Sequence, residues 1–263
     1  MKKIPVLTIL LLFSCSIQAS EYTPCTNSET AANTCFDCGQ NCVARVSYEN
    51  VVQADGSNKQ IGTMVISGTG NMGGWGAKSE PWWDIRNSIH NLTVEEGITS
   101  VGYNAFYRFD QLAHVDLPQS LQTIEPGGFE YCYALTNLDL PEGVALKAES
   151  LESSGITSII IPETSTVDPR TFKADNPGDM PITNIYCSQS NISQCREAVA
   201  YRGDNVNVVQ YEKTSDGQYR MGGLFYQNPS DILSGAHIKK RIYTVDEANS
   251  VSGKTNKVKV RYK

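Results

Sequence analysis

The chain is predicted to fold as a repeat solenoid, a stack of short parallel β-strands joined by irregular connections. One apolar pattern returns between residue 92 and about residue 187, at intervals of 23, 23, 21 and 26 residues. Each interval contains a short segment in which apolar and polar residues alternate, which is typical of a strand with one buried face. A unit of this size cannot bury its own apolar face, so neighbouring units must stack on one another.

The first two units agree position by position, which indicates a true structural repeat. Strands are expected at 91–95, 114–118, 137–141, 158–162 and 184–188, and proline ends three of them because it has no N–H to donate. The third and fourth units share a shorter version of the pattern. The matching positions are Val94, Ile98, Val101, Phe106, Phe109 and Leu112 with Leu117, Leu121, Ile124, Phe129, Cys132 and Leu135, and Leu140, Leu146 and Leu151 with Ile161, Val167 and Phe172.

This pattern, carried most clearly by residues 101–106 and 129–135, resembles the BspA-type bacterial leucine-rich repeats. Units of that family read as a strand, a proline, spaced aliphatic residues, and then Ala-Phe, Cys and Leu at the offsets found here. The resemblance covers somewhat over a third of the chain, and Lys147 departs from it at an aliphatic position. It implies a leucine-rich-repeat fold and a secreted or surface-exposed binding protein, in some cases an adhesin.

The chain begins with a predicted export signal over residues 1–19. Lys2 and Lys3 precede an apolar run that is too short to span a bilayer, and small and polar residues follow it. A lipoprotein signal with Cys15 as the lipidated residue is the alternative. The protein is therefore expected to be periplasmic, displayed on the cell surface or secreted, with membrane attachment only through such a lipid.

Residues 20–90 are predicted to form a cysteine-rich cap and a β lead-in to the repeats. Disulfides are expected at the two ends of the repeat stack because exported proteins use them as staples. Three pairings of the first four cysteines remain open, and a four-thiolate zinc site is the alternative for them. Cys132 replaces Phe109 in the repeat and is expected to be a buried free thiol. The disulfide candidates are Cys25, Cys35, Cys38, Cys42, Cys187 and Cys195.

The lead-in is expected to contain strands at 43–48 and 61–67, followed by a glycine-rich turn at 68–74. Trp82 and Trp83 are expected to close over the first repeat, with an exposed sugar-stacking platform as the alternative. The repeat section is placed at 91–201, including a final capping helix over 193–201 with Ser193 as its N-cap.

Residues 202–263 are predicted to form a small basic α+β module. Strands are expected at 206–213, 224–227 and 257–262, and a helix at 245–251. Residues 238–263 carry a net charge of +6, which suits either contact with an anionic surface or a solvated strand face. The remaining 237 residues carry a net charge of −12, which argues against non-specific nucleic-acid binding.

The predicted function is binding of a protein or glycan through the outward face of the repeat strands, without a cofactor or a metal. Extended repeat surfaces bind large partners through many modest contacts. Ile160 and Tyr186 are expected to be the anchors because they are apolar in an otherwise polar row. The candidate ligand-binding residues are Thr93, His114, Asp116, Asn137, Asp139, Ser158, Ile160, Asn184 and Tyr186, with Asn91 beside them.

The sequence is also compatible with two other classes of function. A structural component of the cell envelope would need no specific ligand. A glycan hydrolase would need a carboxylate pair, for which Asp116 and Asp139 are the candidates, since a repeat of 23 residues places them about 5 Å apart on adjacent strands. The chain has no histidine in a metalloprotease motif and no nucleophile elbow. An enzyme is therefore not predicted.

Overall fold

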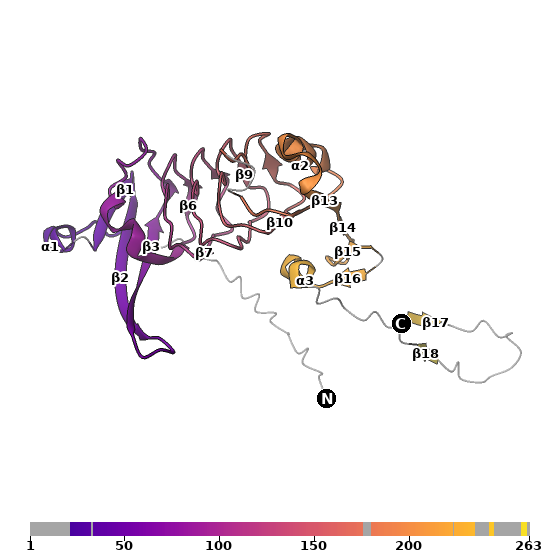
Figure 1. Ribbon diagram of the computed structural model, residues 1–263, viewed down its shortest axis with the longest axis horizontal. Helices are drawn as coiled ribbons and strands as arrows, with labels where there is room; N and C mark the ends of the chain where they lie inside the picture. Colours follow the sequence, from indigo (N-terminus) through magenta and orange to yellow (C-terminus); the bar gives the residue numbers. More distant parts are fainter. Residues whose placement is uncertain are drawn as a thin grey trace, which may run out of the picture.

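The computed structural model describes residues 22–32, 34–175, 180–222, 224–234, 242–244 and 259–261. The predicted export signal, Cys15 and the predicted helix at 245–251 lie outside these residues. Within them, short strands and turns stack along the long axis of the molecule, between an N-terminal β-hairpin and C-terminal helices (Figure 1). The main hydrophobic core runs along the inside of this stack.

The first parallel ladder contains the strands that the sequence predicts. β5 pairs with β3 on one side and with β7 on the other, and β12 lies between β10 and β13. Predicted strands thus form at four of the five expected places. The bounds are β3 Asn58–Gly68, β5 Ile89–Val94, β7 His114–Asp116, β10 Ser158–Ile161, β12 Asn184–Cys187 and β13 Asn207–Gln210.

The predicted strand at 137–141 is wrong, because these residues are among those described and form no strand. The break coincides with the contracted unit, in which the spacing from Leu140 to Ile161 falls to 21 residues. One backbone hydrogen bond still crosses this region, from Thr157 N–H to the Thr136 carbonyl at 3.4 Å. The ladder also continues through β13, beyond the predicted end of the repeat section at residue 201.

A second parallel ladder, which the sequence analysis did not predict, lies on another side of each unit. It is formed by the aliphatic residues six or seven positions after the inward strand residue, such as Val101, Ile124 and Leu146. Its strands are two to four residues long and follow one another in the order β4 Gly70–Asn71, β6 Ile98–Val101, β8 Thr123–Ile124, β9 Ala145–Leu146 and β11 Thr166–Val167.

Turns form the third side, and backbone hydrogen bonds join each turn to the next. Arg108 N–H donates to the Glu130 carbonyl at 2.9 Å, and Tyr131 N–H donates to the Glu152 carbonyl at 2.9 Å. Ser153 N–H continues the series to the Lys173 carbonyl at 3.2 Å. Arg108, Tyr131 and Ser153 occupy equivalent places and share a left-handed backbone, with φ of 57°, 57° and 50°. The turn conformation therefore repeats as the sequence does.

The repeat positions predicted to be inward all belong to the core. Val94 and Ile161 are buried, while Leu117 and Leu140 are half-buried and pack against the same cluster. Cys132 is a buried free thiol, as expected, and its Sγ donates to the Phe106 carbonyl at 3.2 Å. Burial raises the pKa of this thiol.

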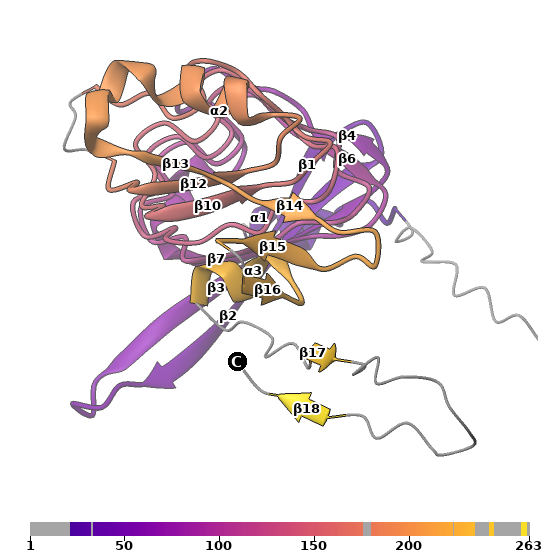
Figure 2. The same cartoon turned by 90° about the vertical axis from the view of Figure 1, so that its right-hand side faces the viewer.

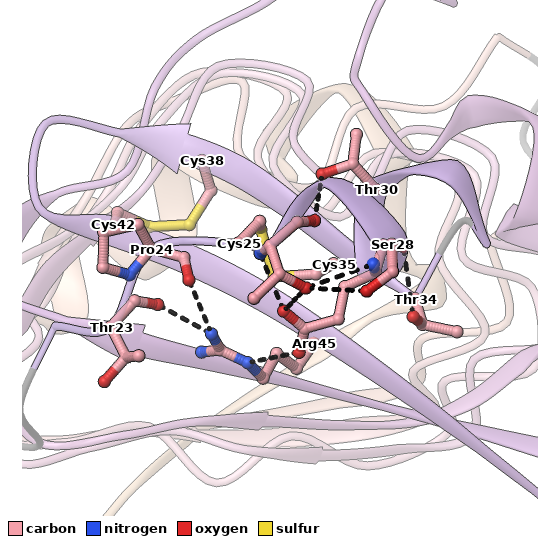
Figure 3. Close-up of a disulfide and its surroundings, with 12 residues drawn as sticks. Thr23, Pro24, Cys25, Ser28, Thr30, Thr34, Cys35, Cys38, Cys42 and Arg45 are labelled. Atoms are coloured by element: carbon pink, nitrogen blue, oxygen red, sulfur yellow. Dashed lines mark hydrogen bonds and ion pairs between the residues drawn. A yellow bond between two sulfur atoms is a disulfide. The ribbon is translucent and has the colours of Figure 1, made fainter.

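An N-terminal cap with two disulfides closes the first end of the stack (Figure 3). The bonds join Cys25 to Cys35 and Cys38 to Cys42, so these cysteines are not four free thiolates, and the zinc alternative is wrong. Arg45 fastens the incoming chain, since its Nη2 donates to the Thr23 carbonyl at 2.7 Å. Thr26 and Glu29 form a capping box on α1 (Asn27–Ala31), and β1 spans Cys35–Gly39.

Trp82 seals the first repeat, as predicted. Its ring is fully buried, stacks on Phe106 with the centroids 5.8 Å apart, and donates from Nε1 to the Ala105 carbonyl at 2.7 Å. The short 3-10 helix η1 (Trp83–Ser88) follows and leads into β5. The glycine-rich turn approaches the repeat so closely that a Cβ on Gly102 would lie 1.6 Å from the Gly73 carbonyl oxygen.

Helix α2 (Ile192–Val199) and the 3-10 helix η2 (Ala200–Asn205) cover the other end of the stack. The Cys187–Cys195 disulfide joins β12 to α2, which completes the three predicted staples. The predicted N-cap at Ser193 is wrong, because the helix begins at Ile192 with Asn191 before it. Asn191 is buried, and its amide donates to the Pro162 carbonyl at 2.7 Å, which fixes the chain before the helix starts.

The C-terminal section forms a small antiparallel sheet beside the strands of the first ladder (Figure 2). Strands near the predicted positions are present, and the short helix α3 is an element that the sequence analysis did not predict. The bounds are β14 Glu212–Lys213, β15 Tyr219–Met221, β16 Leu224–Tyr226, α3 Pro229–Ser234, and the separate pair β17 Ile242–Thr244 with β18 Lys259–Arg261.

Candidate interaction surfaces

The predicted ligand-binding residues on the outward face of the repeat strands, here called the outward strand row, form a continuous row only in part. The registers of the first ladder place Asn91 beside His114 and Thr93 beside Asp116. Farther along, they place Ser158 beside Asn184 and Ile160 beside Tyr186. Asn137 and Asp139 are exposed between these two groups but belong to no strand of the described chain. The carboxylates of Asp116 and Asp139 are therefore not held opposite each other by a ladder.

The expectation that Ile160 is an exposed anchor is wrong. Its exposed fraction is only 7%, and it belongs to a second hydrophobic cluster against which Tyr186 is also packed. The C-terminal section supplies the rest of that cluster, because three tyrosines and an isoleucine from it cover this end of the row. The buried members are Ile160, Tyr211, Tyr219, Tyr226 and Ile232.

Polar contacts hold the C-terminal section in this place. Tyr211 donates its hydroxyl to the Ile161 carbonyl at 2.9 Å, and burial raises the pKa of that hydroxyl. Lys213 Nζ lies 2.7 Å from Glu142 Oε1 and 5.7 Å from the centre of the Tyr219 ring. A cavity of about 180 Å³ lies at the margin, smaller than the roughly 300 Å³ of ordinary small-molecule sites. Leu140, Pro141, Pro162 and Gln119 are among its lining residues.

A row of aromatic rings on the turn side is the more prominent exposed feature of the repeats. Trp83 stacks on Tyr107 with centroids 6.3 Å apart, Tyr107 meets Tyr131 edge-on at 5.7 Å, and Tyr131 lies 6.0 Å from Tyr133. The exposed fraction of Tyr133 is 46%, and the other three rings are half-buried. We call these four residues the turn-side aromatic row.

Two guanidinium groups lie against this row. The Arg86 Cζ is 3.5 Å from the centre of the Trp83 ring, and the Arg108 Cζ is 4.8 Å from the centre of the Tyr131 ring. Both distances are within the range of favourable cation–π contact. The guanidiniums and rings therefore support one another and form a preorganised surface of Trp, Tyr and Arg, the side chains that dominate binding energy at protein interfaces.

Carboxylates border the aromatic row on the following turns. Burial and the charges of Glu152 and Glu149 raise the pKa of Glu130 to about 7. Glu152 is buried, its pKa is raised by that burial, and Lys173 Nζ lies 3.6 Å from it. Tyr131 donates its hydroxyl to Asp175. The surface thus changes from cationic and aromatic at the first turns to acidic and aromatic at the later ones.

This row could not be predicted from the apolar repeat positions, because its rings lie beside those positions and not at them. Tyr107 and Tyr131 come one and two residues after the buried Phe106 and Phe129. Their recurrence beside the core positions of successive units was a usable signal. The two rings become part of one surface because consecutive turns, with left-handed residues at Arg108 and Tyr131, stack on each other.

No group of three or more His, Cys, Asp or Glu side chains suited to a metal ion occurs among the residues that the structure describes. Over the same residues, no helix has both the length and the apolar character needed to cross a bilayer. The three disulfides are typical of proteins outside the reducing cytosol.

Solved structures of bacterial leucine-rich repeat proteins are similar to this chain. The protein from Eubacterium ventriosum is 17% identical with a TM-score of 0.46, and the match covers 70% of this chain and 48% of that one. The protein from Bacteroides ovatus is 15% identical with a TM-score of 0.35 and coverages of 54% and 48%. The T. pallidum protein is 14% identical with a TM-score of 0.37 and coverages of 62% and 78%. This chain thus spans about half the length of the first of these proteins.

No curated protein sequence matches the chain. The family model described as "BspA type Leucine rich repeat region" matches residues 85–177 with six copies of the repeat. The match falls on the turns and ladders described above. Residues 85–177 therefore form a repeat region that matches the BspA type of leucine-rich repeat.

Proposed function

We propose that the chain is an exported binding protein whose partner is another protein, contacted through the turn-side aromatic row. The single observation that supports this most is the row of neighbouring rings of Trp83, Tyr107, Tyr131 and Tyr133, with Arg86 and Arg108 against them. These residue types are enriched at interface hot spots, and the Trp and Tyr rings bury large areas at a small cost in side-chain entropy.

The rigid backbone beneath the row favours binding without reorganisation. Each of these turns is hydrogen-bonded to the next through main-chain groups, and the Phe106 and Phe129 rings stack below them with centroids 5.4 Å apart. Side chains on such a scaffold lose little further freedom when a partner docks. The acidic end around Glu130 favours a partner surface with lysine or arginine at the matching place.

The outward strand row is the alternative surface, and it suits glycan binding better because its exposed members are polar. Its exposed members are His114, Asp116, Asn137 and Asp139, whereas Ile160 is covered. A structural role in the envelope without a ligand is the third possibility. The hypothesis of a glycan hydrolase has lost support, because no strand holds Asp139 beside Asp116.

The test is binding of the purified chain to a panel of immobilised extracellular proteins and to a glycan array. One variant carries Tyr107→Ala, Arg108→Ala and Tyr131→Ala, and the matched control carries His114→Ala, Asp116→Ala and Asp139→Ala. Both sets consist of exposed or half-buried side chains, so thermal unfolding of each variant should remain cooperative.

We expect binding to at least one protein, weakened more than about tenfold by the turn-side variant and little changed by the control. Binding confined to glycans, or lost only in the control, would move the function to the strand row. Absence of binding to both arrays would favour the structural role.

A further inference from the structure

The β2–β3 hairpin extends away from the body of the molecule in both views (Figures 1 and 2). β2 (Cys42–Val52) and β3 pair without interruption from Cys42 with Gly68 to Val52 with Asn58. β1 covers β2 only as far as Arg45, and β5 covers β3 only from Gly62 onward. We call residues 46–61 the arm. Between residues 47 and 61, no other described segment pairs with either of its edges.

The arm exposes apolar side chains where a two-stranded ribbon has least support. The exposed fractions are 37% for Tyr48, 37% for Val51 and 69% for Val52. An isolated two-stranded hairpin is at best marginally stable in water, and an exposed edge strand offers a template for pairing. The edge has no proline and no bulge between Cys42 and Val52 to prevent this.

The free edge of β2 has a defined set of backbone groups. Val46 N–H donates to the Thr34 carbonyl at 2.8 Å, on the side away from β3, whereas Gln53 N–H donates to the Ser57 carbonyl at 2.7 Å across the hairpin. Because successive residues of a strand point their N–H and C=O groups to opposite sides, Tyr48, Asn50 and Val52 present theirs to the open edge.

We propose that this edge pairs antiparallel with the same edge of a second copy of the chain, about a two-fold axis at Asn50. In this register, Asn50 faces Asn50 of the second copy, and Tyr48 faces Val52 in both directions. Every backbone group on the open edge is then used, since each of these is a pair that exchanges both N–H···O=C bonds. A closed two-fold contact of this kind is the commonest form of homo-oligomer.

The side chains are complementary in this register. An aromatic ring opposite a β-branched residue is a favourable cross-strand pair, and Tyr48 opposite Val52 forms it twice. On the other face, Glu49 lies opposite Val51, so no two carboxylates are directly opposed. A register centred on Glu49 would oppose like charges, and one centred on Val51 would leave Tyr48 opposite Ala54, beyond the end of β2. The β3 edge offers only Asn58 and Gln60 and no apolar pair.

The first test is sedimentation velocity of the folded chain from micromolar to near-millimolar concentration. The contact is small, so we expect a reversible dimer that forms at the upper end of this range. Asn50→Pro removes the central donor on the open edge without touching a β2–β3 hydrogen bond, and proline is tolerated on such edges. We expect it to weaken dimerisation at least about tenfold. Gln60→Pro, at the directly opposite residue on the β3 edge, is the matched control and should dimerise like the wild type.

A second measurement tests the register with a short bifunctional thiol reagent. Asn50→Cys should be cross-linked into a covalent dimer, because directly opposite Cβ atoms lie about 5 Å apart in such a pair, within reach of the reagent. Gln60→Cys is equally exposed and should form far less of it. A chain that stays monomeric at the highest concentration, or an Asn50→Pro variant that dimerises like wild type, would overturn the proposal. So would equal cross-linking of the two cysteine variants.

Discussion

Ser153 and Ser154 are adjacent, fully buried serines that differ in backbone conformation. Ser153 has a φ of 50°, in the left-handed region, whereas Ser154 is not among the residues with positive φ. Neither hydroxyl has a hydrogen-bond partner within the described protein. Ser153→Gly should therefore raise the free energy of unfolding by about 1 kcal/mol, because glycine adopts this conformation without the Cβ penalty.

Ser154→Gly is the control for that substitution. It removes the same side chain from an ordinary backbone position, so it should leave stability unchanged or lower it. Urea unfolding of the two variants measures the difference. A stabilisation of equal size in both would show that the buried hydroxyl, and not the turn, is the cause.

Glu130 makes stability depend on pH in a predictable direction. Its pKa is about 7 in the folded chain against 4.5 as its ordinary value, so the folded state holds the proton more tightly. The stabilisation from this proton is complete below pH 4.5 and is lost as the pH rises through 7. Glu130→Gln should be more stable than wild type at pH 8 by on the order of 1 kcal/mol, after allowance for partial exposure, and about equal at pH 5.

Thermal unfolding across this pH range checks the effect of Glu130, with Glu163→Gln, an exposed carboxylate, as the control. A Glu130→Gln variant that loses stability in parallel with wild type between pH 5 and pH 8 would contradict the assignment.

Sequence periodicity predicted the burial of single residues well where they occupy a position that recurs in successive units. The burial of Phe106, Phe129 and Cys132 followed from their offsets alone. Ile160 shows the limit of such predictions, because the tyrosines that cover it, Tyr211, Tyr219 and Tyr226, come more than fifty residues later in the chain. Alternation correctly placed Ile160 on the outward face, but no local pattern reveals what covers that face.

At the level of elements, the Cys187–Cys195 disulfide fastens the last predicted repeat strand to the capping helix. Cys187→Ala combined with Cys195→Ala should lower the free energy of unfolding by about 2–3 kcal/mol, mostly by freeing the unfolded chain. Denaturant unfolding of this variant measures the loss.

The buried Cys132 should resist thiol reagents in the wild type and in this variant until the protein unfolds. Rapid labelling of the native wild type at Cys132 would contradict the packing described here.

Strands could be predicted where apolar and polar residues alternate along them. They could not be predicted where they are only very short. The two-residue strands β8, β9 and β11 leave no alternation to detect, so the second ladder was missed. The strand expected at 137–141 failed for a different reason. Its alternation is intact, but its neighbour comes from the shortened unit, and a strand needs a partner in register as well as a pattern.

In the whole molecule, the C-terminal section occupies one end of the surface that the sequence analysis assigned to ligand binding. Ile160→Asp should undock this section, because a carboxylate would be buried among Tyr211, Tyr219 and Tyr226. Trypsin cleavage at Lys213 and Arg220 should become at least about tenfold faster, while the repeats stay resistant.

The control for undocking is Asp139→Ala, in the same row but exposed, which should cleave like wild type. Digestion of the repeats at the same rate as the C-terminal section would show that Ile160 supports the whole fold and not only this contact.

The three-sided build of the stack has a consequence for how such a molecule can change in length. Strands on two sides and turns on the third are each joined to their counterparts one unit away. Duplicating one complete coil preserves all of these links, whereas duplicating part of a coil leaves at least one side without its counterpart. The stack can therefore lengthen by duplication, or shorten by deletion, only in whole coils, while the disulfide-closed ends stay the same.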